Sequence, residues 1–182
     1  MKTRLSIDPG LLGTGVAIWN GEDWGSLELP VLCGNITPKR SKDPWEQRAV
    51  YILYEFDTLL VPSVEHVYFE WPDFHDDAGG HTTARRGDLR KLLFVASSLI
   101  SACWLKGIPT TLFEVWEWKG QLPKELVEKR IKQRLPEIVT RLKPTTHSWD
   151  AIGVGLHAKG HLHLGLKEKP VTSKGNLSCG RR

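Results

Sequence analysis

The sequence of 182 residues contains only three cysteines, Cys33, Cys103 and Cys179, and they lie far apart along the chain. This spacing argues against a disulfide framework and indicates unpaired thiols in a reducing compartment. The sequence also lacks a signal-peptide pattern and any apolar run that approaches the length of a membrane span. We therefore expect a soluble, cytoplasmic protein that has no membrane partner. Near the C-terminus, His157, His161 and His163 precede Cys179, but their spacing matches no closed zinc site.

Charge is distributed unevenly along the chain. Residues 1–91 hold 10 Lys and Arg against 14 Asp and Glu, whereas residues 92–182 hold 15 against 7. A solvated basic surface would explain the second half alone. The contrast between the halves also favours a polyanionic partner bound by the second half, with metal-binding acids supplied mostly by the first.

The stretch from Leu5 to Trp19 predicts a tight hairpin of two strands. Its first apolar run ends at Asp8, and a turn rich in glycine and proline follows. Two kinds of fold use such an opening. Ribonuclease-H-like nucleases use the acid to hold a divalent metal, and actin-like phosphotransferases use the acid and the glycines around a nucleotide phosphate.

The remaining sequence predicts an α/β domain over residues 1–159, with a five-stranded mixed sheet and helices on both faces. Residues 160–182 form a basic tail that we expect to be flexible. A helix is expected to start with Asp43 as its N-cap and Pro44 at its first position. After the hairpin, the predicted strands are 24–36, 66–69 and 109–115, and the predicted helices are 44–60, 83–106, 123–142 and 147–158.

Four side chains fall where a metal-dependent site would need them. Asp8 and Glu70 each follow an apolar strand, and open α/β sheets place ligands at strand ends. His147 and Asp150 are three residues apart on a predicted helix, so they share one of its faces. Carboxylates with one imidazole suit Mg²⁺ or Mn²⁺, and two such ions can hold both oxygens of a phosphodiester displacement.

These residues resemble the motifs of the RuvC family of Holliday-junction resolvases, which belong to the ribonuclease-H-like superfamily. The resemblance rests on Asp8-Pro9-Gly10-x-x-x-Thr14-Gly15, on Glu70 and on His147-x-x-Asp150-Ala151, and it extends over the element order from Lys2 to about Lys159. It implies a ribonuclease-H-like fold, catalytic metal binding by Asp8, Glu70, His147 and Asp150, and a homodimer that makes paired nicks in four-way DNA junctions. The short length and divergent connecting sequence suggest a phage-encoded member.

The resemblance also implies an aromatic residue at the junction centre, in the loop after the second acid. Phe74 is the nearest match and Trp71 the second, although Trp71-Pro72 and the acids Asp73, Asp76 and Asp77 depart from the family pattern. Asp73 or Asp77 is also a candidate outer metal ligand. Basic side chains near the proposed site are candidates for phosphate contacts, since such contacts supply affinity and register. These are Arg85, Arg86, Arg90, Lys91, Lys119 and Lys124.

Three other functions remain open at this point. A related ribonuclease-H-like nuclease would cut flaps, replication forks or RNA–DNA hybrids. An actin-like ATP-binding phosphotransferase would need about twice this length and a second glycine-rich phosphate loop, which the sequence lacks. A DNA-binding module with an inactive site is disfavoured by the intact set of four candidate ligands.

Overall fold

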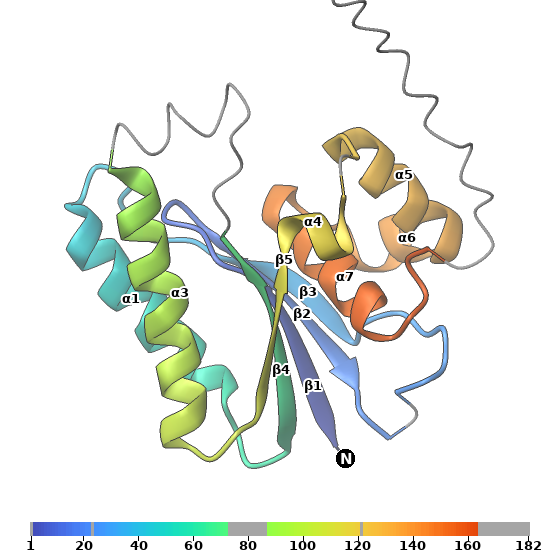
Figure 1. The fold of residues 1–182 in the computed structure, drawn as a ribbon, viewed down its shortest axis with the longest axis horizontal. Coiled ribbons are helices and arrows are strands. Elements are labelled where there is room, and N and C mark those ends of the chain that lie inside the picture. Colours follow the sequence, from blue (N-terminus) through green and yellow to red (C-terminus); the bar gives the residue numbers. More distant parts are fainter. Residues whose placement is uncertain (1, 23, 73–86, 121, 164–182) are drawn as a thin grey trace, which may run out of the picture.

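A computed structural model describes residues 2–22, 24–72, 87–120 and 122–163 (Figure 1). Five strands form one mixed sheet in the order β3-β2-β1-β4-β5. β1 pairs antiparallel with β2 and parallel with β4, while β3 and β5 form the two edges. The strands are β1 (Thr3–Asp8), β2 (Thr14–Asn20), β3 (Leu32–Ile36), β4 (Val64–Trp71) and β5 (Thr110–Glu114).

Helices cover both faces of the sheet, which confirms the predicted architecture (Figure 1). One layer consists of α1 and α3, and the other is built mainly from α7 with α4, α5 and α6 beside it. The helices are α1 (Trp45–Leu59), α3 (Asp88–Leu105), α4 (Val115–Trp118), α5 (Lys124–Arg134), α6 (Ile138–Leu142) and α7 (Thr146–Ala158). Among the described helices, none has the length and apolar character needed to cross a membrane.

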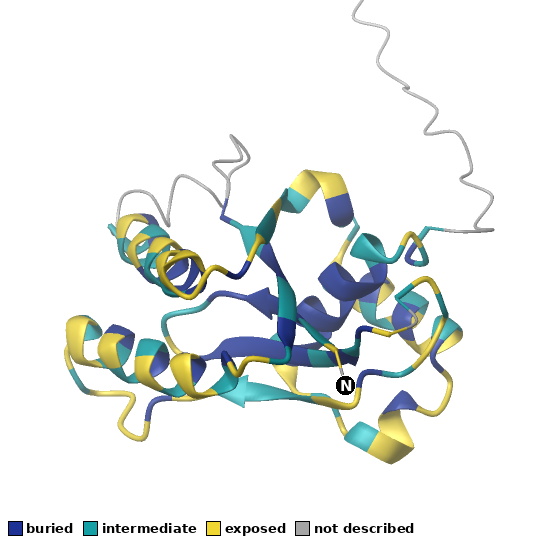
Figure 2. Cartoon of the chain, turned by 90° about the horizontal axis from the view of Figure 1, so that it is seen from below, coloured by how far each residue is buried: buried dark blue, intermediate teal, exposed yellow. Residues whose placement is uncertain are grey.

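Alternation along the central strands divides the core in two. Successive side chains of a strand point to opposite faces, so Leu5 and Ile7 of β1 join the cluster under α1 and α3. Ser6, which lies between them, accepts a hydrogen bond from Trp19 Nε1 at 2.8 Å in the cluster under α7. Figure 2 shows the resulting band of buried residues between helices whose outer surfaces are exposed. Asp8 follows the same alternation and therefore belongs to the α7 face.

Two predicted boundaries are wrong for identifiable reasons. The third strand begins at Leu32 instead of Trp24, because the segment before it turns back over the sheet and stacks Trp24 on Tyr68 at 5.0 Å. The basic helix predicted over 123–142 is two helices, α5 and α6. Pro136 lies between them, and a proline has no N–H to donate within a helix.

Other helix boundaries shift by smaller amounts. α3 begins at Asp88, after Gly87 adopts a left-handed φ of 68° that a continuous right-handed helix does not allow. The predicted cap of α1 is displaced by one residue, since Pro44 occupies the N-cap position and Asp43 lies outside the helix. The loop expected over 116–122 contains the short helix α4.

Candidate active site

Sheet pairing places the two strand-end acids side by side. β1 and β4 are parallel neighbours, with Ile7 opposite Phe69, so Asp8 and Glu70 follow at the same end of the sheet. Both side chains alternate onto the α7 face, since the residues before them pack on the other face. Asp8 is 7% exposed, and the Oε2 atom of Glu70 is buried without a hydrogen-bond partner.

Three close approaches seat α7 on the sheet. A Cβ atom on Gly15 of β2 would lie 2.1 Å from the backbone oxygen of His147, so only glycine fits there. Within α7, a Cβ on Gly153 would lie 2.5 Å from Trp118, and one on Gly155 would lie 2.4 Å from Trp19. The glycines let the helix approach these rings closely, and this contact fixes the position of the N-terminal turn of α7.

The N-terminal turn of α7 brings its polar residues to the acids of the sheet. Thr145 and Ser148 form a reciprocal capping box that starts the helix. His147 Nδ1 lies 3.1 Å from Asp8 Oδ2. Asp150 is 8% exposed, and its Oδ1 atom is buried without a hydrogen-bond partner. The predicted helical pair therefore meets the predicted strand-end pair.

Two lysines lie against the carboxylate of Asp150. Lys124 Nζ is 3.0 Å from Oδ2, and Lys119 Nζ is 3.7 Å from Oδ1. Lys119 precedes α5 and Lys124 begins it, so both cations reach the site from the β5 side. They partly neutralise a carboxylate that would otherwise be buried among other acids.

Burial and mutual repulsion raise the pKa of the sheet acids. Desolvation raises the pKa of Glu70 well above its ordinary value, and the charges of Asp8 and Asp150 raise it further. The pKa of Asp8 is also raised by burial, although the hydrogen bond with His147 opposes the shift. The same hydrogen bond raises the pKa of His147. The fold therefore concentrates negative charge in a place where water cannot solvate it well.

The donor set fits a hard divalent cation. Three carboxylates and one imidazole are suitable ligands for Mg²⁺ or Mn²⁺, and two buried carboxylate oxygens lack partners. Among the described residues, however, no three Asp, Glu, His or Cys side chains converge as a metal-binding cluster in the present arrangement. Binding a cation would therefore require these side chains to close in around it and Asp150 to exchange its lysine partners.

Comparison of the whole fold with solved structures identifies its architecture. A structure of Thermus thermophilus RuvC in complex with a Holliday junction substrate superimposes with a TM-score of 0.63 at 20% identity, over 88% of this chain and 94% of that one. A second T. thermophilus RuvC structure gives 0.60 at 18% identity, with the same coverage. The chain has the RuvC fold. No protein-family model matches the sequence, and no curated protein matches it either.

The other residues predicted to contact DNA or a metal lie in several different parts of the fold. Trp71 ends β4 and packs, partly buried, against the core under α1 and α3. Arg90 is exposed on α3, and Lys91 pairs with Asp88 at 3.1 Å. Some of the predicted residues lie outside the described part of the chain, namely Phe74, Arg85, Arg86, Asp73, Asp77 and Cys179.

Two structural supports of the site were not predicted from sequence. Trp118 is fully buried beside Glu70, where its indole N–H partly opposes the pKa rise without forming a well-aligned hydrogen bond. Thr14 Oγ1 contacts both the backbone N–H and the carbonyl oxygen of Gly10 at 3.3 Å, which closes the turn after Asp8. A tryptophan in a predicted loop was the only available signal for the first, and the Gly10-x-x-x-Thr14 spacing for the second.

Proposed function

We propose that this protein is a divalent-metal-dependent endonuclease that resolves four-way DNA junctions by paired nicks. The observation that supports this proposal is that Asp8, Glu70, His147 and Asp150 come from three separate segments to the same end of a RuvC fold. There His147 contacts Asp8, and the charges of Asp8 and Asp150 raise the pKa of Glu70. A solved protein with this fold was captured with a Holliday junction substrate. Buried acids with unpartnered oxygens cost stability, and such perturbed titratable groups occur mostly at functional sites.

One group of residues in the site would hold the metal ions. Asp8, Glu70, Asp150 and neutral His147 would hold the metal ions. Two bound Mg²⁺ or Mn²⁺ ions would activate a water and stabilise the charge on the attacking and leaving oxygens. Hydrogen bonding to Asp8 orients the His147 ring toward the site before any cation binds.

Lys119 and Lys124 would contact the scissile strand. Both amines already lie at the acid cluster, and neither has another salt-bridge partner within the described residues. If Asp150 held a cation, the two ammonium groups would be free to contact phosphate oxygens of the DNA. The lysines would therefore exchange a carboxylate partner for a phosphate partner during substrate binding.

Symmetrical cleavage of a junction requires two active sites, and we propose a homodimer. The outer surfaces of the α1 and α3 layer carry large exposed apolar side chains, including Tyr54 at 67% and Phe94 at 54% exposure. These surfaces are suitable for association with a second copy. Sedimentation of the purified chain, alone and with junction DNA, measures the stoichiometry directly.

Cleavage of matched substrates tests the function. Labelled four-way junction, linear duplex, flap, fork and RNA–DNA hybrid are incubated with the protein with and without Mg²⁺. We expect paired, symmetric nicks in the junction alone, dependent on Mg²⁺ and absent with Asp150→Asn. Preferential cutting of flaps, forks or hybrids would instead favour a related nuclease, and ATP hydrolysis without any DNA cleavage would favour the actin-like phosphotransferase.

A further inference from the structure

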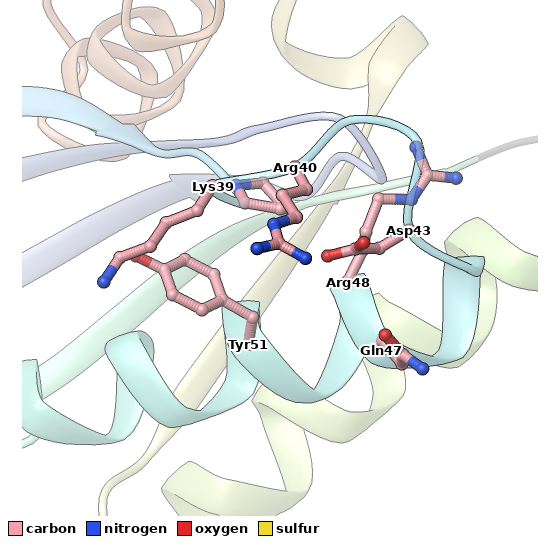
Figure 3. A pocket seen from close by; sticks show the side chains of 7 residues that line it. Lys39, Arg40, Asp43, Gln47, Arg48 and Tyr51 are labelled. Carbon is pink, nitrogen blue, oxygen red and sulfur yellow. The ribbon is translucent and has the colours of Figure 1, made fainter.

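A basic cavity of about 280 Å³ lies between the β3–α1 connection and the first turns of α1 (Figure 3). Lys39 and Arg40 line it from the connection, and Arg48 lines it from the helix. Asp43 is the single acid in the lining, while Gln47 and Tyr51 add neutral polar groups. The cavity is therefore surrounded by three cations and one anion, together with side chains that can donate hydrogen bonds.

Asp43 offsets at most one of the three positive charges in the lining. Within the described ranges, no carboxylate oxygen lies within 4 Å of a side-chain nitrogen of Lys39, Arg40 or Arg48. Arg48 Nη1 donates only to the Ser41 carbonyl at 3.4 Å, and its Nε is buried without a partner. Guanidinium groups match phosphate oxygens in shape and charge, and Arg48 retains unused donors for such a ligand.

The shape of the connection holds these side chains around the cavity. The Asp43 N–H donates to the Arg40 carbonyl at 3.2 Å, which closes a turn immediately before α1. No side chain caps the N-terminus of α1, so its first N–H groups add partial positive charge to the same region. The three cations outnumber Asp43 in the lining and Glu46 in the first turn of α1, so this region carries a net positive charge.

The cavity is close to the candidate active site. Ile36, at the end of β3, pairs with Thr14 of the turn after Asp8. A Cβ on Gly13 would lie 3.5 Å from both Thr37 Oγ1 and His147 Cδ2. Gly13 therefore neighbours both His147 and Thr37, the residue just before the cavity lining. Lys39 follows two residues later, within about 7 Å of Thr37 along the backbone.

The sheet order places basic groups on both sides of the acids. Lys119 and Lys124 approach from the β5 edge. The cavity lies in the connection that follows β3 at the other edge, and β2, β1 and β4 separate β3 from β5. Figure 1 shows the β3–α1 connection, the β1–β2 turn and α4 at the same end of the sheet. A nucleic-acid strand that crosses this end would meet cations before and after the cluster of acids.

We propose that Lys39, Arg40 and Arg48 bind a backbone phosphate of the substrate DNA, a few nucleotides from the scissile phosphate. This inference rests on the proposed nuclease function and adds a second, separate anchoring site to it. Phosphate contacts fix register without reading sequence. The cavity would therefore hold one arm of the substrate in position while the acids act on a linkage a few nucleotides away.

Salt-dependent DNA binding in EDTA tests the site without involving cleavage. The double variant Lys39→Ala/Arg40→Ala is compared with Lys42→Ala, which removes an exposed cation from the same turn but outside the cavity lining. We expect the double variant to bind junction and duplex roughly tenfold more weakly, with a log–log salt slope that is shallower by about one per lost contact. Lys42→Ala should bind like the wild type, and the thermal midpoints of all three proteins should agree.

The remaining outcomes separate this inference from the proposed function. If the wild type cuts junctions but the double variant keeps the wild-type slope, the cavity site is wrong and the nuclease assignment stands. If the wild type neither binds nor cuts DNA, both fall. If inorganic phosphate raises the thermal midpoint of the wild type but not of the double variant, while DNA binding is unchanged, the cavity takes free phosphate and the DNA assignment is overturned.

Discussion

The Nδ1 atom of His147 lies 3.1 Å from Oδ2 of Asp8, although 139 positions separate them in the sequence. This contact joins the first turn of α7 to the end of β1 and links the pKa values of the two groups. The pair lies beside Glu70 and Asp150. The His147–Asp8 hydrogen bond and the ion pairs of Asp150 with Lys119 and Lys124 stabilise the site, while repulsion among the carboxylates opposes them. The predictions below follow from this balance.

Removing the charge of Glu70 should stabilise the metal-free protein. Its pKa is raised well above the ordinary value of 4.5, so the folded state binds a proton more tightly than the unfolded state. Stability should therefore decrease as pH rises from about 4.5 through the raised value. In EDTA, we expect Glu70→Gln to melt at a higher temperature than the wild type at pH 8, and the difference should shrink toward pH 4.5.

Divalent cations should reverse the order of the melting temperatures of the wild type and Glu70→Gln. Added Mg²⁺ or Mn²⁺ should raise the melting temperature of the wild type by neutralising the buried acids, and it should have little effect on Glu70→Gln. Scanning fluorimetry over a metal titration provides the measurement. An equal shift in both proteins would contradict metal binding at Glu70.

Asp150→Asn should separate DNA binding from cleavage. The substitution keeps the shape but removes the charge that would hold a cation, so junction cleavage should fall by orders of magnitude. It also releases Lys119 and Lys124 from their ion pairs, and junction binding in EDTA should persist or tighten. Junction cleavage by Asp150→Asn at the wild-type rate would contradict both the four-ligand site and the nuclease proposal.

His147 should set the acid limb of activity. Imidazole binds a metal only when neutral, and the hydrogen bond to Asp8 raises the pKa of His147 above 6.5 in the metal-free protein. Protons therefore compete with the cation as pH falls, and more metal should move the midpoint lower. We expect His147→Asp to retain cleavage and to shift the acid limb to lower pH, measured as pH–rate profiles at fixed and raised Mg²⁺.

The close seating of α7 gives a test of packing. Alanine normally stabilises a helix by about 1 kcal/mol relative to glycine. At Gly153, however, the added methyl would lie 2.5 Å from Trp118, and overpacking should destabilise the fold by ~1–3 kcal/mol. Gly34→Ala is the control, since a Cβ there meets nothing within 4 Å. Urea denaturation of both variants would distinguish the two positions, and a stabilised Gly153→Ala would disprove the contact.

The sequence by itself determined most of the elements and the placement of the four candidate ligands on them. Apolar runs predict the strands that end near Asp8 and Glu70, and the spacing of His147 and Asp150 puts both on one helical face. These are local properties of the chain, so residue order is sufficient to read them. The error in the third strand, which was predicted to begin at Trp24, could not be detected from local sequence, because the stacking of Trp24 on Tyr68 is a long-range contact.

Only the tertiary structure decided which side chains become neighbours. Lys119 and Lys124 are basic residues in the sequence, but their pairing with Asp150 depends on how α5 packs beside α7. In the sequence, Lys39 and Arg40 are part of an ordinary basic loop. They line a cavity only because the fold places Arg48 of α1 opposite them. Burial, charge repulsion and cavities depend on distances between segments that are remote in sequence, and these distances are set when the two helical layers pack on the sheet.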